Sequence, residues 1–154
     1  MPRGTLANPA DLESVLSRFV RLQPDSPRQW GRMTAQEMLC HVADAFGMAL
    51  GRLPVAERMT LYGISGPVMK WLALSLPFPW PHGIRGPAEV DPHRQGTRPA
   101  AFAGDCERVV WLTRQFAAEI GGESRHPMFG TMTRTDWLRW GYLHCDHHLR
   151  QFGC

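Results

Sequence analysis

Three of the seven histidines lie within five consecutive positions near the end of the chain, at residues 144, 147 and 148. His144 and His148 are four residues apart, and side chains at this spacing stand one above the other on a helix, where they can share one ion. Imidazole nitrogens are common ligands of zinc and other divalent transition metals. The spacing therefore indicates a metal site. Two buried histidines bonded to backbone or water are the structural alternative.

The segment that carries these histidines is predicted to be a helix from residue 133 to about residue 151. It opens with Thr133-Arg134-Thr135-Asp136, an acidic capping box in which side chains bond the first backbone N–H groups. The predicted face of each histidine follows from the rotation of about 100° per residue along a helix.

With Trp137 at zero, His148 falls near 20° and His144 near 340°, whereas His147 falls near 280°, at the boundary of the apolar face. We therefore expect His144 and His148 to point into the protein and Trp137 to line their pocket. The opposite side is expected to face solvent, and it carries the charged residues Arg139, Asp146 and Arg150.

A third candidate ligand, His41, lies on another predicted helix. That helix begins with the capping box Thr34-Ala35-Gln36-Glu37 and ends near Gly51. His41 is on the flank of its apolar stripe, and in a helical bundle this flank can face the helix of His144 and His148. A boundary histidine paired with Glu37 or Asp44 is the structural alternative.

Apolar periodicity predicts two further long helices and a short one. The first opens with Asn8-Pro9-Ala10-Asp11 and stops before Pro24, the next spans residues 105 to about 120, and the short one spans residues 67–76. Six of the thirteen prolines fall within residues 77–104, which predicts a long loop that serves as a lid or as a simple surface connection. No alternating strand pattern is present. We therefore predict a single all-α domain over residues 1–154, a four-helix bundle with a long Pro/Gly-rich crossover loop.

The other chemistry-bearing residues are weaker candidates. His82, His93 and His126 stand beside proline or glycine in predicted loops, where we expect surface positions. Cys145 is expected to pack as a small apolar residue and not to bind metal. Asp44 is expected to be a solvated acid or an acceptor for a metal-bound histidine.

Composition and missing motifs exclude several classes of protein. The net charge of +3 is small for a nucleic-acid-binding domain, and the most apolar stretch, residues 68–80, is shorter than the roughly 20 residues of a membrane span. The four cysteines form no CxxC pair and residues 1–9 carry no apolar signal segment, so we expect a cytoplasmic protein. His41 does not begin an HExxH motif, which disfavours a zincin-type protease.

Two stretches of the sequence resemble a known superfamily. Trp30 and residues 33–44 look like the second-helix motif of the DinB/YfiT-like metalloenzymes. Residues 126–130, Thr133, Trp137 and residues 144–153, which end in His-Leu-Arg-Gln-Phe-Gly, closely resemble the DUF1569 branch of that superfamily. The resemblance implies a four-helix bundle that binds one divalent metal ion through three histidines, which match His41, His144 and His148.

Three neutral imidazoles leave open positions on an ion, which is typical of catalytic zinc; Ni²⁺, Fe²⁺ and Mn²⁺ also accept nitrogen ligands. Characterised members of the wider superfamily include thiol-dependent S-transferases. The resemblance therefore implies a transferase that joins a low-molecular-weight cellular thiol to a small-molecule substrate. A metal-dependent hydrolase and a non-catalytic metal-binding or stress-response protein are the alternatives. Catalytic residues other than the ligands are not assigned. Because proteins of this kind often pair, the expected partners include a second copy of the chain.

Overall fold

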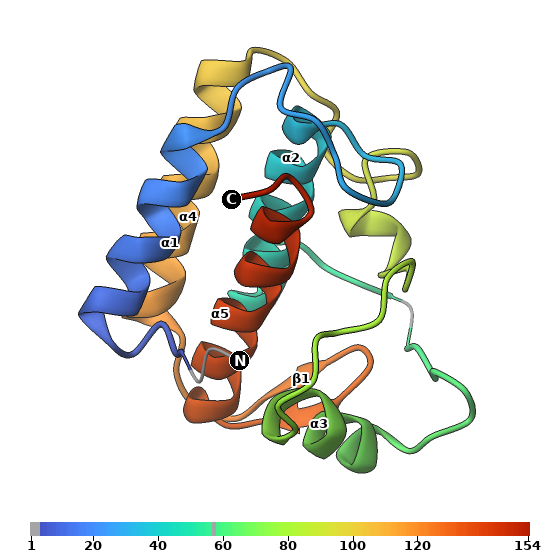
Figure 1. The fold of residues 1–154 in the computed structure, drawn as a ribbon. Helices are drawn as coiled ribbons and strands as arrows, with labels where there is room; N and C mark the ends of the chain where they lie inside the picture. Colours follow the sequence, from blue (N-terminus) through green and yellow to red (C-terminus); the bar gives the residue numbers. More distant parts are fainter. Residues whose placement is uncertain (1–3, 57) are drawn as a thin grey trace.

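The computed structural model describes residues 4–56 and 58–154, and within them the chain is mostly helical (Figure 1). The described residues form five α-helices, one 3-10 helix and a two-stranded sheet. In chain order these elements are α1 (Pro9–Arg21), α2 (Ala35–Ala49), α3 (Gly66–Ser75), η1 (Ala88–Val90), α4 (Phe102–Glu119), β1 (Ser124–His126), β2 (Gly130–Met132) and α5 (Arg134–Arg150).

Each of the four long helices packs against two of the others. α1 contacts α4 and α5, and α2 contacts the same two helices. Figure 1 shows α1 beside α4 and α2 beside α5. The apolar faces meet in one core, where the ring centroids of Phe46 and Phe116 are 4.6 Å apart and Trp137 is buried. This packing places α2 directly against α5, the helix that carries three of the seven histidines.

The helix starts agree closely with the sequence prediction. Both predicted capping boxes form, Thr34 with Glu37 at α2 and Thr133 with Asp136 at α5. Burial raises the pKa of Asp136, but hydrogen bonds from the backbone and side chain of Thr133 and from Lys70 outweigh it and leave the pKa below its ordinary value. α4 begins at Phe102, three residues before the expected start.

The all-α prediction needs one correction, because the chain forms a small hairpin before α5. β1 and β2 pair antiparallel, with His126 opposite Gly130. Each strand has only three residues, which is too short to show an alternating pattern in the sequence. Gly130 has a φ of +73°, in the left-handed region that glycine adopts without strain.

The side of α5 opposite the histidines was expected to face solvent, and this prediction is wrong for Asp146. Asp146 is buried, and its carboxylate pairs with the guanidinium of Arg18 on α1 at 2.9 Å. Arg18 also donates to the carbonyl oxygen of Cys154. α5 is therefore covered by α1 on one side and by α2 on another. A carboxylate buried in this way is costly unless it is paired, and Arg18 supplies the pairing charge for Asp146.

The long connection between α3 and α4 is fixed to the helices by Asp44. This carboxylate is buried and accepts hydrogen bonds from the backbone N–H of Thr97 at 2.7 Å, from the hydroxyl of Thr97 at 2.8 Å and from Arg108 at 2.7 Å. The predictions of a solvated acid or of an acceptor for a metal ligand are therefore wrong for Asp44. Within the described part of the chain, no helix is long and apolar enough to cross a bilayer.

Candidate metal centre

The three predicted ligands come together at the contact between α2 and α5. His41 from α2 and His144 and His148 from α5 each present one ring nitrogen, and these nitrogens all lie within 4.8 Å of one another. The Nε2 atoms of His41 and His144 are 3.2 Å apart. Two nitrogens bound to one tetrahedral zinc ion at about 2.05 Å are about 3.3 Å apart. The spacing therefore fits a single shared ion.

Two of the three rings have their orientation fixed by neighbours outside the cluster. Nδ1 of His41 donates to the carbonyl oxygen of Val90 at 2.7 Å, and Nδ1 of His148 donates to Oε1 of Gln151 at 3.0 Å. The amide nitrogen of Gln151 in turn donates to the carbonyl oxygen of Trp30 at 2.9 Å, which fixes the orientation of this amide. A nitrogen that donates carries the ring proton, so the lone pair of both histidines is on Nε2.

His144 is held differently, by the indole of Trp140. The two rings stack with centroids 4.9 Å apart and an angle of 16° between their planes. Nδ1 of His144 is buried without a hydrogen-bond partner among the described residues. Without a metal, a proton on Nε2 of His144 could be donated to Nε2 of His41. The lone pair of His148 would then still face the cluster with no proton to accept. A divalent ion fits the donor set better, because it takes one lone pair from each ring.

The protonation state of the cluster also suits metal binding. Burial lowers the pKa of His41, and it lowers the pKa values of His144 and His148 well below the ordinary value of 6.5. Charge on the neighbouring histidines would lower the pKa values of His144 and His148 further. All three rings are therefore neutral at pH 7, the form that binds a metal.

No fourth protein ligand joins the cluster among the described residues. Cys145 is fully buried in the core, and burial raises the pKa of its thiol, in agreement with the prediction that it packs as an apolar residue. His147 also stays outside the cluster, as its helical position predicted. Three protein ligands with a free position are typical of catalytic metal sites.

The cluster lies in the wall of a cavity of about 690 Å³. Part of this wall is the loop between α3 and α4, including Phe78, Trp80 and Val90. The aromatic residue of α5 in the cavity wall is Trp140, and the prediction that Trp137 lines the pocket is wrong. Trp137 points instead into the core, where its indole nitrogen donates to Ser124 at 2.9 Å.

The chain matches the family model described as "Protein of unknown function (DUF1569)" over residues 10–153. The chain belongs to the DUF1569 family. No curated protein and no solved structure matches the chain. The matched span contains all three histidines of the cluster, and the predicted resemblance to DUF1569 is confirmed.

The other loop histidines of this DUF1569 protein have distinct positions. His82 is exposed, as predicted, and its ring stacks on Trp30 with centroids 4.0 Å apart. His93 lies 2.9 Å from the carboxylate of Glu37. His126 does not occupy the surface position predicted for it, because the hairpin folds its ring against Phe129 and into the cavity wall.

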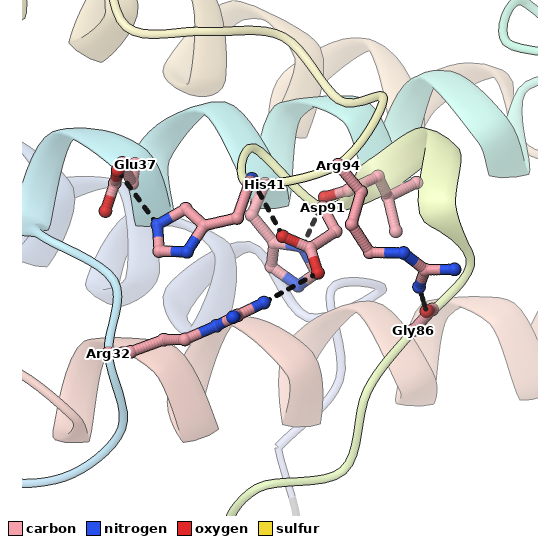
Figure 2. A network of polar contacts seen from close by, with 8 residues as sticks. Arg32, Glu37, His41, Gly86, Asp91 and Arg94 are labelled. Atoms are coloured by element: carbon pink, nitrogen blue, oxygen red, sulfur yellow. Dashed lines mark hydrogen bonds and ion pairs between the residues drawn. The ribbon is translucent and has the colours of Figure 1, made fainter.

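The loop that supplies the acceptor for His41 is held by side-chain contacts to α2 and to the segment just before it. Figure 2 shows Asp91, next to Val90 in sequence, reached by the guanidinium of Arg32 at 3.2 Å. Glu37 of α2, labelled in the same view, also contacts this loop, because its carboxylate lies 2.9 Å from Nε2 of His93. These contacts fix the position of the Val90 carbonyl and therefore the orientation of the His41 ring.

Sequence reasoning missed the residues that orient the histidines. Gln151 lies in the predicted helix with no role that the sequence indicates, and Trp30 and Val90 act through backbone carbonyl groups that no side-chain pattern reveals. The available signal was the spacing of His148 and Gln151, three residues apart, which places their side chains as neighbours on one helical face.

Proposed function

We propose that this DUF1569 protein is a divalent-metal-dependent enzyme whose ion, with Zn²⁺ preferred over Ni²⁺, Fe²⁺ or Mn²⁺, is held by His41, His144 and His148. The observation that carries the proposal is the convergence of three neutral ring nitrogens, within 4.8 Å of one another, in the wall of a cavity. A purely structural metal site is usually closed by four protein ligands. The described residues supply three, which favours an enzyme over a non-catalytic metal-binding or stress-response protein.

We propose as the reaction the transfer of a low-molecular-weight cellular thiol to a small electrophilic substrate. When bound, a divalent ion supplies Lewis-acid chemistry that lowers the pKa of a thiol or of water at its open position. The residues of the chain orient the ion's ligands through Val90 and Gln151 and exclude water with the apolar cavity wall. The thiol sulfur would form the new bond to carbon, the leaving group would depart with the bonding pair, and the thiol proton would pass to solvent.

The arrangement of α1, α2, α4 and α5 supports assignment as a four-helix bundle of the DinB/YfiT-like type, since each helix packs on two others. The four free cysteines support a reducing compartment, for which we propose the cytoplasm. The cavity size suits a small molecule as the partner.

A single assay separates transfer from hydrolysis. Zinc-loaded protein is incubated with glutathione, cysteine or no thiol, and with 1-chloro-2,4-dinitrobenzene or 4-nitrophenyl acetate. The transferase predicts thioether formation that depends on thiol and on metal and is abolished in His148→Ala. Release of 4-nitrophenol without thiol, lost in the same variant, would instead establish a hydrolase. Rates equal to those of His148→Ala with every combination would contradict catalysis at this site.

A further inference from the structure

The cavity beside the histidine cluster has a mainly apolar wall. Several flexible methionines contribute to it, and such side chains adapt to ligands of different shape. The charge of Asp91 in this wall is paired with Arg32. The third charged side chain of the wall, Arg85, is exposed, so the buried part of the wall suits an uncharged organic molecule. The methionines that line the cavity are Met33, Met48, Met59, Met69 and Met128.

One polar group in this wall lies outside the histidine cluster and has a fixed hydrogen-bonding character. Nδ1 of His126 accepts hydrogen bonds from the backbone N–H of Met128 at 3.1 Å and of Phe129 at 3.3 Å. An accepting nitrogen has no proton, so the ring proton of neutral His126 is on Nε2. Burial lowers the pKa of His126 to about 3, which keeps the ring neutral at pH 7.

The ring of His126 is also held rigidly in place. It stacks on Phe129 with centroids 4.4 Å apart, and Trp137 and Trp140 lie 5.5 and 5.4 Å from it on other sides. Trp140 in turn stacks on His144, so this donor and the histidine cluster contact the same indole. A fixed donor in an apolar wall favours a ligand that brings an acceptor and disfavours one that leaves the N–H unpaired.

We infer that the cavity binds an apolar organic molecule that carries a carbonyl oxygen, and that this oxygen accepts a hydrogen bond from Nε2–H of His126. Binding of this molecule in the cavity needs no metal. The inference rests on the proposed function only where it identifies the bound molecule as the substrate. His126 is then a specificity-determining residue, and it places the carbonyl group in the same cavity as the three histidines.

The test compares hexanophenone with 2-phenyl-1-heptene, in which a methylene group replaces the carbonyl oxygen. Binding to the protein as purified, and again after removal of metal with a chelator, is measured by titration of its backbone amide NMR signals. We expect the ketone to bind about 10-fold more tightly than the hydrocarbon in both forms. Equal affinities, or no binding of either probe, would overturn the inference.

Two variants of His126 isolate the donor. In His126→Asn, the side-chain oxygen can replace Nδ1 as acceptor for the turn, but the Nε2–H is lost, so the preference for the ketone should disappear while hydrocarbon affinity stays constant. In His126→Gln, an amide N–H can reach the former Nε2 position, so the preference should be retained in part. A preference unchanged in His126→Asn would overturn the inference.

A further measurement does not depend on a variant or on a ligand. The ¹⁵N chemical shifts of the His126 ring at pH 7 should report a proton on Nε2 and none on Nδ1. The opposite tautomer would overturn the inference even if ketones bind. A protein that prefers ketones but holds no metal would contradict the proposed function alone, and a metalloprotein without the preference would contradict this inference alone.

Discussion

Replacing Gln151 by leucine tests whether the metal affinity depends on the orientation of His148. Gln151 is buried and lies between two groups, because its Oε1 accepts from Nδ1 of His148 and its Nε2 donates to the carbonyl oxygen of Trp30. Its backbone is held separately, since the N–H of Gln29 donates to the Gln151 carbonyl at 2.7 Å. A Gln151→Leu variant therefore loses the side-chain bonds and keeps the backbone anchor.

The expected loss can be estimated from what Nδ1 of His148 would face. Without the amide oxygen, a proton on Nδ1 is buried and unpaired, which costs about 1–3 kcal/mol and favours the tautomer with the proton on Nε2. That tautomer has no lone pair for the ion. Loss of such an outer acceptor typically weakens metal binding by about 10- to 100-fold, or about 1.4–2.7 kcal/mol.

The assay is competition for Zn²⁺ with a chromogenic chelator at pH 7.5. Gln151→Glu is the matched control, because its carboxylate still accepts from His148 although it cannot donate to Trp30. We expect Gln151→Leu to bind zinc 10- to 100-fold more weakly than the wild type and Gln151→Glu to stay within a few-fold. Equal affinity of Gln151→Leu and wild type, with both proteins folded, would refute the role of Gln151.

Three further changes test the framework around the site. In Gly31→Ala, the new Cβ would lie 2.5 Å from the amide nitrogen of Gln151, at a φ of +77°, so we expect about 10-fold weaker zinc binding by chelator competition. The control is Gly51→Ala, at a φ of +71° with nothing within 4 Å of the new Cβ, which should show only backbone strain and unchanged zinc affinity. Asp136→Asn should lower the free energy of unfolding by about 1 kcal/mol at pH 7 in urea titrations. Because the pKa of Asp136 is lowered by folding, this difference should persist above its ordinary value of 3.8 and disappear as the pH falls through the folded-state pKa, and a constant difference would contradict the assignment. Arg18→Met leaves the buried carboxylate of Asp146 with only Arg150, at 3.6 Å, as an ionic partner and should cost about 2 kcal/mol in the same assay, whereas Arg18→Met/Asp146→Leu should recover most of it.

The parts of the structure that follow from local sequence were predictable. Capping boxes at Thr34 and Thr133 define the starts of α2 and α5 because they satisfy backbone N–H groups within a few residues. The inward direction of His144 and His148 follows from helical rotation alone. The position of His41 opposite them depends on how two helices pack, and helical periodicity left it open; it was expected from the resemblance of residues 33–44 to the DinB/YfiT-like metalloenzymes.

The features that escaped prediction depend on contacts between distant segments. The sequence predicts that Asp146 is exposed because it lies opposite the apolar face of its helix. In the structure, α1 packs on that opposite face and Arg18 pairs with Asp146. His126 looked like a surface residue because it precedes a proline, yet a three-residue strand pairing turns it toward the cavity. Trp137 and Trp140 are three residues apart on α5, yet Trp137 donates to Ser124 of the hairpin whereas Trp140 lines the cavity, a difference that depends on packing between segments.

The central claim is that His41, His144 and His148 hold one divalent ion, and elemental analysis of the protein purified without added metal tests it most directly. The wild type should contain about one equivalent of a divalent transition metal per chain, and each of the three His→Ala variants should lose it. His147→Ala is the matched control, because it removes a neighbouring imidazole that lies outside the cluster, and it should retain the metal. A wild-type protein that neither contains nor binds a divalent metal, or one whose metal survives all three substitutions, would contradict the account.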